Sequence, residues 1–318
     1  MSVFPQKPAL WQVWLILILG VMAVATSAPI IRVALASAAT QGLGFSLFLA
    51  ATRLVMASVF LVPAWRSLPV RQITGATWGY AIAAGCCLAL HFATWFTSLS
   101  FTSIAASTAL VTTNPVWVAL LSWLWFGRRP TGITVGGIAI ALTGGMVIAW
   151  GGAQGSASGT APLFGDALAL MGSWMASLYF MLGREAQRRG LSIGQYVAIA
   201  YAVAAIVLLP LPPVFNISYL GYPPLVYGCI LLMAILPQLI GHTVINWSVT
   251  QISPTIVTLA ILFEPVGSSL MGWALFSEIP GRFVLLGGAI LLMGVAISII
   301  GEPRTPAPAS KPDSVEPR

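Results

Sequence analysis

Ten apolar stretches of roughly 20 residues, divided by short breaks, constrain the fold of this chain more than any other feature of its sequence. They lie near 11–36, 43–64, 77–98, 101–126, 132–150, 164–187, 193–211, 224–248, 253–277 and 281–300. About 20 predominantly apolar residues let a helix cross the hydrocarbon core of a bilayer, whereas barrel strands are alternating segments of about ten residues. The sequence therefore predicts an all-α membrane protein with ten transmembrane helices.

The composition excludes a soluble domain. Charged residues make up 7% of the 318 residues and hydrophobic residues 58%, whereas a soluble domain carries roughly 25% charged residues. The basic residues behind the net charge of +7 lie mostly in short loops and form no continuous patch, so nucleic acid is not an expected partner. The first apolar run is too long for the core of a signal peptide, and we expect it to remain as the first helix.

The loop charges predict the orientation in the membrane. Basic residues gather in alternate loops and at both ends of the chain, namely Lys7, Arg66, Arg71, Arg128, Arg129, Arg184, Arg188, Arg189, Arg304, Lys311 and Arg318. The loops near 37–42, 99–101, 151–163 and 212–223 hold no Lys or Arg, and Arg282 is the exception on that side. The positive-inside rule then places both termini in the cytoplasm. We expect a multi-pass protein of the cell inner membrane.

The chain contains an internal repeat. Shifted by 150 positions, its second half matches the first without a gap over roughly 101–147. The matched pairs include Pro115 with Pro265, Trp123 with Trp273 and Gly144 with Gly294, and one further residue of shift pairs His91 with His242. Each predicted half holds five helices. Because five is odd, the second half must enter the membrane inverted relative to the first.

The repeat divides the chain into four parts. We expect a first repeat over 1–150 (helices 1–5), a Gly- and Ser-rich linker over 151–163, a second repeat over 164–300 (helices 6–10) and a disordered, cytoplasmic, Pro-rich tail over 301–318. Inverted repeats are common in secondary transporters, whose substrate site lies near mid-membrane between the repeats. The two halves would then rock about a central cavity lined by helices 1, 3, 4, 6, 8 and 9. A repeat can also record only the duplication of a stable bundle.

Three short stretches carry a family resemblance. They are Leu88 to Phe96 followed by Asn114-Pro115-Val116, then Gly165 to Leu170, then Asn246-Trp247 followed by Glu264-Pro265-Val266. In order and spacing they resemble the EamA-type members of the drug/metabolite transporter superfamily, over about residues 11–300. The resemblance implies ten helices in inverted repeats and the export of amino acids or related small metabolites. Asn114 stands where the second half has Glu264, so the two halves need not do equal chemistry.

Four ionisable residues inside the apolar runs are candidates for substrate binding or coupling, because each costs roughly 2.5–3.5 kcal/mol on insertion scales. Glu264 lies mid-run, where its carboxylate can bind a substrate amine, carry a proton or serve as a packing acid paired to a neighbour. Arg53 can meet a substrate carboxylate, or pair with Glu264 or backbone carbonyls. His91 and His242 hold related positions in the two halves, and each can relay protons or act as a hydrogen-bonded packing residue.

Uncharged side chains complete the candidate set for substrate binding or coupling: Trp95, Trp174, Asn114, Gln238 and Asn246. The tryptophans lie near mid-run and can stack on an amphipathic substrate, or pack against lipid and neighbouring helices. The amides offer neutral hydrogen bonds. Pro115 and Pro265 interrupt helical hydrogen bonding in the fourth and ninth runs and are candidate gating elements.

The sequence lacks the motifs of several common catalytic and nucleotide-binding sites. The chain has no P-loop, no His-Glu-x-x-His zinc motif and no nucleophile elbow, so we expect no enzyme activity, no cofactor and no bound metal. The sequence predicts a secondary transporter that exports amino acids or related small metabolites by alternating access, with the small-molecule substrate and the lipid bilayer as partners and protons as the candidate coupling ion. Two alternatives remain: a membrane-embedded enzyme acting on a lipid-linked substrate, and a channel or non-transporting sensor.

Overall fold

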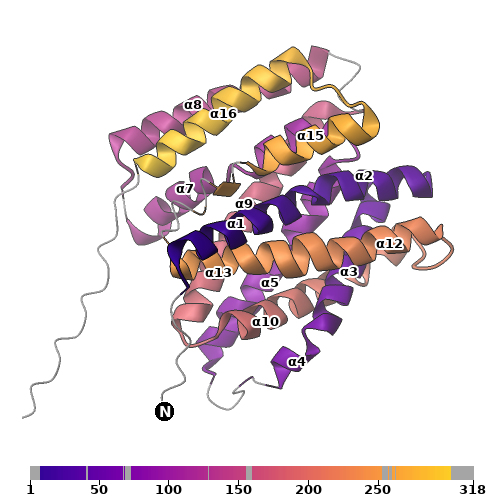
Figure 1. Cartoon of the computed structure of the whole chain (residues 1–318), viewed down its shortest axis with the longest axis vertical. Helices are drawn as coiled ribbons and strands as arrows, with labels where there is room; N and C mark the ends of the chain where they lie inside the picture. Colours follow the sequence, from indigo (N-terminus) through magenta and orange to yellow (C-terminus); the bar gives the residue numbers. More distant parts are fainter. Residues whose placement is uncertain are drawn as a thin grey trace, which may run out of the picture.

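The described part of the chain is helical and contains no strand (Figure 1). The computed structural model describes residues 8–40, 42–66, 68, 73–127, 129–154, 160–252, 257, 260–261 and 263–301. The predicted all-α class is therefore confirmed for these residues. The predicted disordered tail, apart from its first residue, lies outside them, as does much of the linker.

The first five apolar runs contain eight described helices. They are α1 (Leu10–Ala25), α2 (Ser27–Ala38), α3 (Leu43–Phe60), α4 (Val62–Trp65), α5 (Gly75–Ser98), α6 (Ile104–Val111), α7 (Asn114–Phe126) and α8 (Gly132–Gln154). The first run divides at Thr26, and the fourth divides at Thr112 and Thr113. The second break has a local cause, because Pro115 has no backbone N–H and suits the first turn of a new helix rather than the interior of a continuous one.

The remaining runs contain another eight described helices. They are α9 (Pro162–Arg188), α10 (Ile193–Leu208), α11 (Leu211–Val214), α12 (Pro224–Met233), η2 (Ala234–His242), α13 (Thr243–Gln251), α15 (Glu264–Phe276) and α16 (Arg282–Ile300). The segment η2 is a π-helix that contains Pro237. Proline removes one backbone hydrogen bond from a helix, and the wider π-turn accommodates the lost bond.

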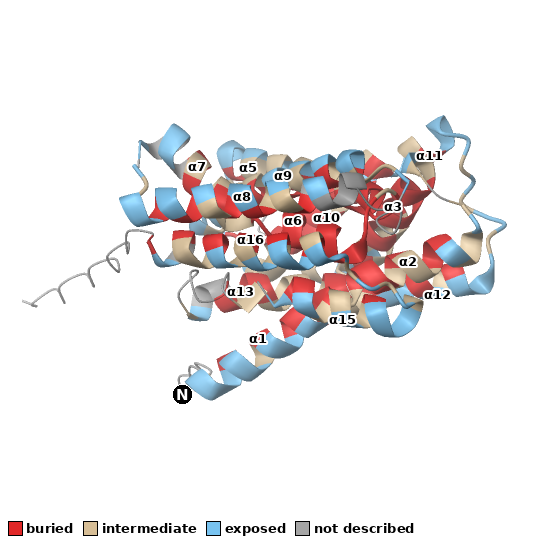
Figure 2. Cartoon of the chain, turned by 90° about the horizontal axis from the view of Figure 1, so that it is seen from above, coloured by how far each residue is buried: buried red, intermediate tan, exposed pale blue. Residues whose placement is uncertain are grey.

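The helices have the dimensions and surface of membrane spans. Among the described residues, seven segments are long and apolar enough to cross a bilayer: Leu10–Ala38, Leu43–Phe60, Gly75–Ser98, Ile104–Leu121, Pro162–Arg188, Ile193–Val214 and Pro224–Ser248. Figure 2 shows buried residues inside the bundle and exposed residues on its outer faces. The exposed positions include large apolar side chains such as Leu124, Ile206 and Leu270. Apolar side chains on the outer face of a long helix suit contact with lipid.

Two shorter apolar helices, Gly132–Ile148 within α8 and Arg282–Ser298 within α16, pack side by side (Figure 1). Glycine allows their close approach. A Cβ atom on Gly137 would lie 2.7 Å from the carbonyl oxygen of Gly294, and one on Gly144 would lie 2.6 Å from that of Gly287. Residue numbers rise along one helix as they fall along the other, so the pair is antiparallel. Small residues at such contacts are typical of helix pairs in membranes.

Candidate functional site

A cavity lies between the two halves of the chain. The first half contributes Val24, His91, Trp95, Val111, Thr112 and Asn114, and the second half contributes Ala176, Phe180, His242, Ile245, Ile261 and Glu264. These residues belong to the six runs that the sequence analysis assigns to helices 1, 3, 4, 6, 8 and 9. The wall is mainly apolar, with a few polar side chains of both halves, as is typical of a small-molecule site.

Glu264 is the acidic residue of this cavity. It is the first residue of α15 and its side chain is buried, with 7% of the residue exposed. The first turn of a helix carries partial positive charge from its free N–H groups, and this field favours a carboxylate there. The helix start therefore helps to hold an acidic group at a depth where isolated charge is costly.

Asn114 holds the equivalent place at the first residue of α7, but its side chain is engaged. The Ser173 hydroxyl donates to Asn114 Oδ1 over 2.7 Å, and the Thr113 hydroxyl donates to Ser173 Oγ over 2.9 Å. The Ser177 hydroxyl donates to the Asn114 carbonyl oxygen over 3.1 Å. Asn114 thus connects α7 to α9 while it lines the cavity.

His91 is fixed by α9 on one side and by an aromatic ring on the other. Its Nδ1 lies 2.9 Å from the carbonyl oxygen of Gly172. The two helices are close at this point, because a Cβ on Gly172 would lie only 3.3 Å from Cβ of Trp95. Because a carbonyl only accepts, Nδ1 is the donor, and Nε2 is then the lone-pair nitrogen of the neutral ring. The imidazole stacks on Trp95, with centroids 5.8 Å apart and planes 14° apart.

The two predicted histidines meet around one aromatic ring. Phe92 lies 4.8 Å from the ring centroid of His91 and 5.7 Å from that of His242, the second contact being edge-on. Asn246 donates to the backbone carbonyl oxygen of His242 over 2.7 Å and lies 3.5 Å from the Tyr179 hydroxyl. Asn246 is buried but is not part of the cavity wall.

Arg53 and Gln238 lie beyond the cavity wall. Both are fully buried. Arg53 donates from Nε to Gln238 Oε1 over 2.9 Å and from Nη1 to Ser27 Oγ over 3.0 Å, and its guanidinium carbon lies 4.4 Å from the centre of the Phe92 ring. The remaining candidate, Trp174, is 41% exposed and is not part of the cavity wall.

The two candidate gating prolines occupy matching positions. Pro115 is the second residue of α7 and Pro265 is the second residue of α15. Each therefore follows a break in its apolar run rather than bending a continuous helix, and each lies next to a cavity residue.

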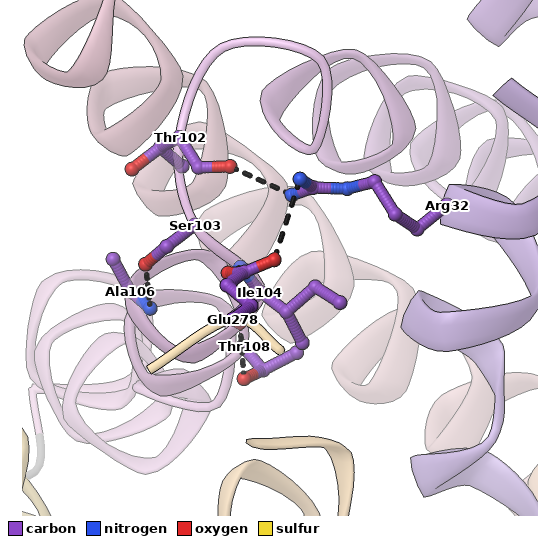
Figure 3. Close-up of polar contacts among 7 residues, drawn as sticks. All are labelled: Arg32, Thr102, Ser103, Ile104, Ala106, Thr108 and Glu278. Atoms are coloured by element: carbon purple, nitrogen blue, oxygen red, sulfur yellow. Dashed lines mark hydrogen bonds and ion pairs between the residues drawn. The ribbon is translucent and has the colours of Figure 1, made fainter. Parts of the chain in front are cut away.

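Sequence reasoning missed a polar cluster at one end of the bundle. Figure 3 draws four of its five residues, namely Arg32, Thr102, Ile104 and Glu278. Arg32 of α2 forms a 3.3 Å ion pair with Glu278, which follows α15, and donates to the Thr102 carbonyl oxygen over 3.0 Å. The backbone N–H of Ile104, at the start of α6, donates to the other Glu278 oxygen over 2.6 Å. The Thr102 hydroxyl donates to Asp166 of α9 over 2.8 Å. We call these five residues the Arg32–Glu278 cluster.

The cluster joins four segments that are distant in sequence. In the sequence alone, Arg32 is a basic residue near a helix end and its length suits a side chain that extends to the membrane surface. The signal that points to a pair is the scarcity of charge, because Arg32 and Glu278 are two of few charged residues predicted on the same side of the membrane.

Comparison with known proteins gives the family. The model of the EamA-like transporter family matches residues 11–150 and again residues 163–300. The chain belongs to this family. The resemblance seen in the sequence motifs is thereby confirmed, and the apolar helices are those of a multi-pass membrane protein.

Individual relatives agree with the family. A probable terminal-alkyne amino-acid exporter of Streptantibioticus cattleyicolor is 27% identical over 293 residues, covering 88% of this chain and 91% of the relative. An uncharacterized transporter of Archaeoglobus fulgidus is 24% identical over 286 residues, covering 89% and 96%. A solved crystal structure superposes with a TM-score of 0.59 at 17% identity, covering 93% of this chain and all of that one. The last likeness supports the fold alone.

Proposed function

We propose that this protein is a secondary transporter that exports amino acids or related small metabolites by alternating access. The observation that carries the proposal is the cavity built equally from both halves of the chain, with Glu264, His91 and His242 on its wall. Secondary transporters with inverted repeats bind their substrate at such an interface. The S. cattleyicolor relative, named as a probable amino-acid exporter, supports this substrate class.

The proposed architecture is ten transmembrane helices in two inverted five-helix repeats. The helices α7 and α15 support it, because each has 13 residues and they start 150 positions apart. The α8–α16 pair gives independent support. Gly137 contacts Gly294, which is the repeat equivalent of Gly144. In turn, Gly144 contacts Gly287, which is the repeat equivalent of Gly137. Such reciprocity is expected of a two-fold axis between inverted halves.

The arrangement suggests how a substrate would be held. The Glu264 carboxylate would bind an amine, and Trp95, Phe180 and Ile245 would contact an apolar side chain. Each histidine offers an imidazole that can accept and release a proton, so we include protons as the candidate coupling ion. An exporter in the inner membrane with both termini in the cytoplasm fits the distribution of loop charges.

Alternating access requires that one end of the cavity closes while the other opens. The Arg32–Glu278 cluster would hold one end closed, because it joins α2 and α6 of the first half to α9 and the residue after α15 of the second half. The breaks before Pro115 and Pro265 would serve as hinges between the cavity and the helix ends.

The test is transport by the purified protein in proteoliposomes. Radiolabelled amino acids and small amines are offered with and without a pH gradient, and counterflow from preloaded vesicles is measured beside vesicles without protein. We expect saturable counterflow of one class of compound, since a carrier exchanges substrate across a closed intermediate. Flux that never saturates and shows no counterflow would indicate a channel and would contradict the proposal.

A further inference from the structure

Arg53 is a buried cation that forms no ion pair with the described residues. Its side chain is fully buried in α3, and no carboxylate among the described residues lies within the 4.0 Å limit of an ion pair with its guanidinium. Its two hydrogen-bond partners, Ser27 and Gln238, are both neutral. A buried charge in a low-dielectric interior normally has an ionic partner. Arg53 therefore offers a buried positive charge that an anion would stabilise.

The donors that would bind this anion are present and free. Arg53 Nη2 and Gln238 Nε2 are buried and have no hydrogen-bond partner in the described structure. The two side chains are adjacent, because Arg53 Nε donates to the oxygen of the same Gln238 amide over 2.9 Å. Two free N–H donors on neighbouring planar groups suit the two oxygens of a carboxylate.

The helix that carries Gln238 is distorted at this point. Gln238 lies inside the π-helix η2, directly after Pro237 and four residues before His242. Isolated π-turns are rare and occur frequently at functional sites, where they reorient a side chain. One irregular segment thus carries both a free amide donor and a cavity histidine.

The Phe92 ring contacts both Arg53 and two residues of the cavity wall. The Phe92 ring lies 4.4 Å from the Arg53 guanidinium carbon and contacts the rings of His91 and His242. On the cavity side, the indole N–H of Trp95 is another buried donor without a partner in the described structure. A rotation of Phe92 would therefore join the Arg53 region to the cavity.

We propose that Arg53 and Gln238 form a carboxylate subsite that a rotation of Phe92 joins to the cavity, so that the transported compound is an α-amino acid held by its amine at Glu264 and by its carboxylate at Arg53 and Gln238. This inference rests on the proposed transport function and assigns the two charges of the substrate to two places. The mainly apolar wall of the cavity suits amino acids with apolar side chains.

The experiment compares acids with analogues that lack the carboxylate. The probes are L-leucine and L-phenylalanine, their amides, and the corresponding amines, isoamylamine and phenethylamine. Each set keeps the amine and the side chain. Binding to the full-length protein in detergent is measured from the ligand-induced rise in Tm, and transport is measured in proteoliposomes by competition with the labelled acid.

The decisive variant is Gln238→Glu, which places a carboxylate of the protein beside Arg53 and so occupies the subsite. We expect the wild type to prefer the acid over its amide by at least about tenfold, and the variant to reduce this preference to within about twofold. The variant pairs the buried cation, so its unliganded Tm should equal or exceed that of the wild type. Gln195→Glu, which adds the same charge in the first turn of α10, is the matched control and should keep the preference.

A second variant separates charge from geometry. Arg53→Lys keeps the positive charge but loses the planar fork that can bind both oxygens of a carboxylate, so the preference should fall to an intermediate value. Equal binding of acid and amide by the wild type would overturn the subsite. So would an unchanged preference in Gln238→Glu.

The two readouts distinguish this inference from the function on which it rests. Counterflow of acid and amide at equal rates would support the transport function and contradict the carboxylate subsite. A preference for the acid in binding, without any flux, would support the carboxylate subsite and contradict the transport function.

Discussion

The helices α7 and α15 share a backbone but differ in chemistry. Each has 13 residues, begins with a polar residue followed by proline, and ends at a residue in the left-handed conformation, Gly127 at φ 62° and Ser277 at φ 54°. At the first position, Asn114 hydrogen-bonds to α9, whereas Glu264 presents a carboxylate to the cavity. The comparison teaches that a repeated scaffold can keep its geometry while only one copy carries the charge.

The largest effect should come from removing that charge. We expect Glu264→Gln to lower transport at least about 30-fold, because the amine of the substrate would lose its only carboxylate partner at the site, a loss of about 2 kcal/mol or more. The protein should still fold, since glutamine keeps the shape of the side chain. Counterflow and Tm, measured on the same preparation, check both statements.

The exchange variant, with Asn114→Glu and Glu264→Asn together, tests the asymmetry directly. We expect no recovery of transport, because a carboxylate at 114 would lie against the Ser173 hydroxyl that now donates to Asn114. Full recovery would mean that the two halves are chemically interchangeable. If Glu264→Gln, expressed at the normal level, transported as fast as the wild type, Glu264 would not be a substrate-binding residue.

The next largest effect concerns the geometry that the halves share. A Cβ on Gly144 would lie 2.4 Å from the backbone nitrogen of Leu291, and one on Gly294 would lie 2.3 Å from that of Ala141. Backbone atoms have little freedom to move, so Gly144→Ala and Gly294→Ala should each cost about 1–3 kcal/mol of stability. Unfolding in mixed detergent micelles measures the free energy.

Gly145 of α8 and Gly288 of α16 provide controls on the same two helices. A Cβ on Gly145 would meet its nearest atom at 3.7 Å, and one on Gly288 would meet nothing within 4 Å. Alanine at either position should be neutral or stabilising, because alanine favours helix. If only one of Gly144 and Gly294 proved sensitive, the α8–α16 pair would not be symmetric in energy.

The sequence predicts the repeated features far better than the unique ones. Each apolar run contains a described helix, because membrane helices are specified by local hydrophobicity. Glu264, His91 and His242 line one cavity, and rare polar residues in apolar runs are the signal that selects them. Trp174 is exposed, and hydrophobic periodicity gives no warning, because a membrane helix can be apolar on both its lipid-facing and its buried faces.

Pairings between distant segments are harder to predict. The Arg32–Glu278 ion pair depends on how α2 approaches the residue after α15, and no local pattern records that approach. The position of Arg53 behind Phe92 depends on the packing of α3 against α5 and η2 in the same way. Side-chain partners across a bundle follow from tertiary packing, whereas helix existence follows from the segment itself.

A smaller effect is expected from removing the charge of Glu278, the acidic residue that comes after α15. Glu278→Gln would keep the hydrogen bond from the Ile104 N–H but lose the ion pair with Arg32. Since both side chains are partly exposed, the loss of stability should be only about 0.2–1 kcal/mol. If the Arg32–Glu278 cluster closes one end of the cavity, Glu278→Gln should open that end. A cysteine introduced at the cavity residue Thr112 should then react a few-fold faster with a thiol reagent added on the side of the cluster than it does when Glu278 is intact.

The control for this variant is Arg282→Gln. Arg282 lies four residues from Glu278 and its guanidinium stacks on Phe283, so its loss removes a charge without breaking the Arg32–Glu278 pair. The labelling is done in a background with serine at Cys86, Cys87 and Cys229. Equal labelling rates in the wild type, Glu278→Gln and Arg282→Gln would show that the cluster does not close the cavity.

A last pair of variants distinguishes the two helix ends. Gly127→Ser should destabilise the protein by about 1 kcal/mol, because an L-residue in the left-handed region brings Cβ close to the following carbonyl oxygen. Ser277 already bears that strain, so Ser277→Gly relieves it but also gives the unfolded chain more freedom, and the gain should be between zero and about 1 kcal/mol. Opposite signs for the two variants, measured by unfolding in micelles, would show that the second half has kept the helix end of the first after losing the glycine that favours it. A loss of stability in Ser277→Gly would instead mean that the serine side chain stabilises this end through contacts that the first half lacks.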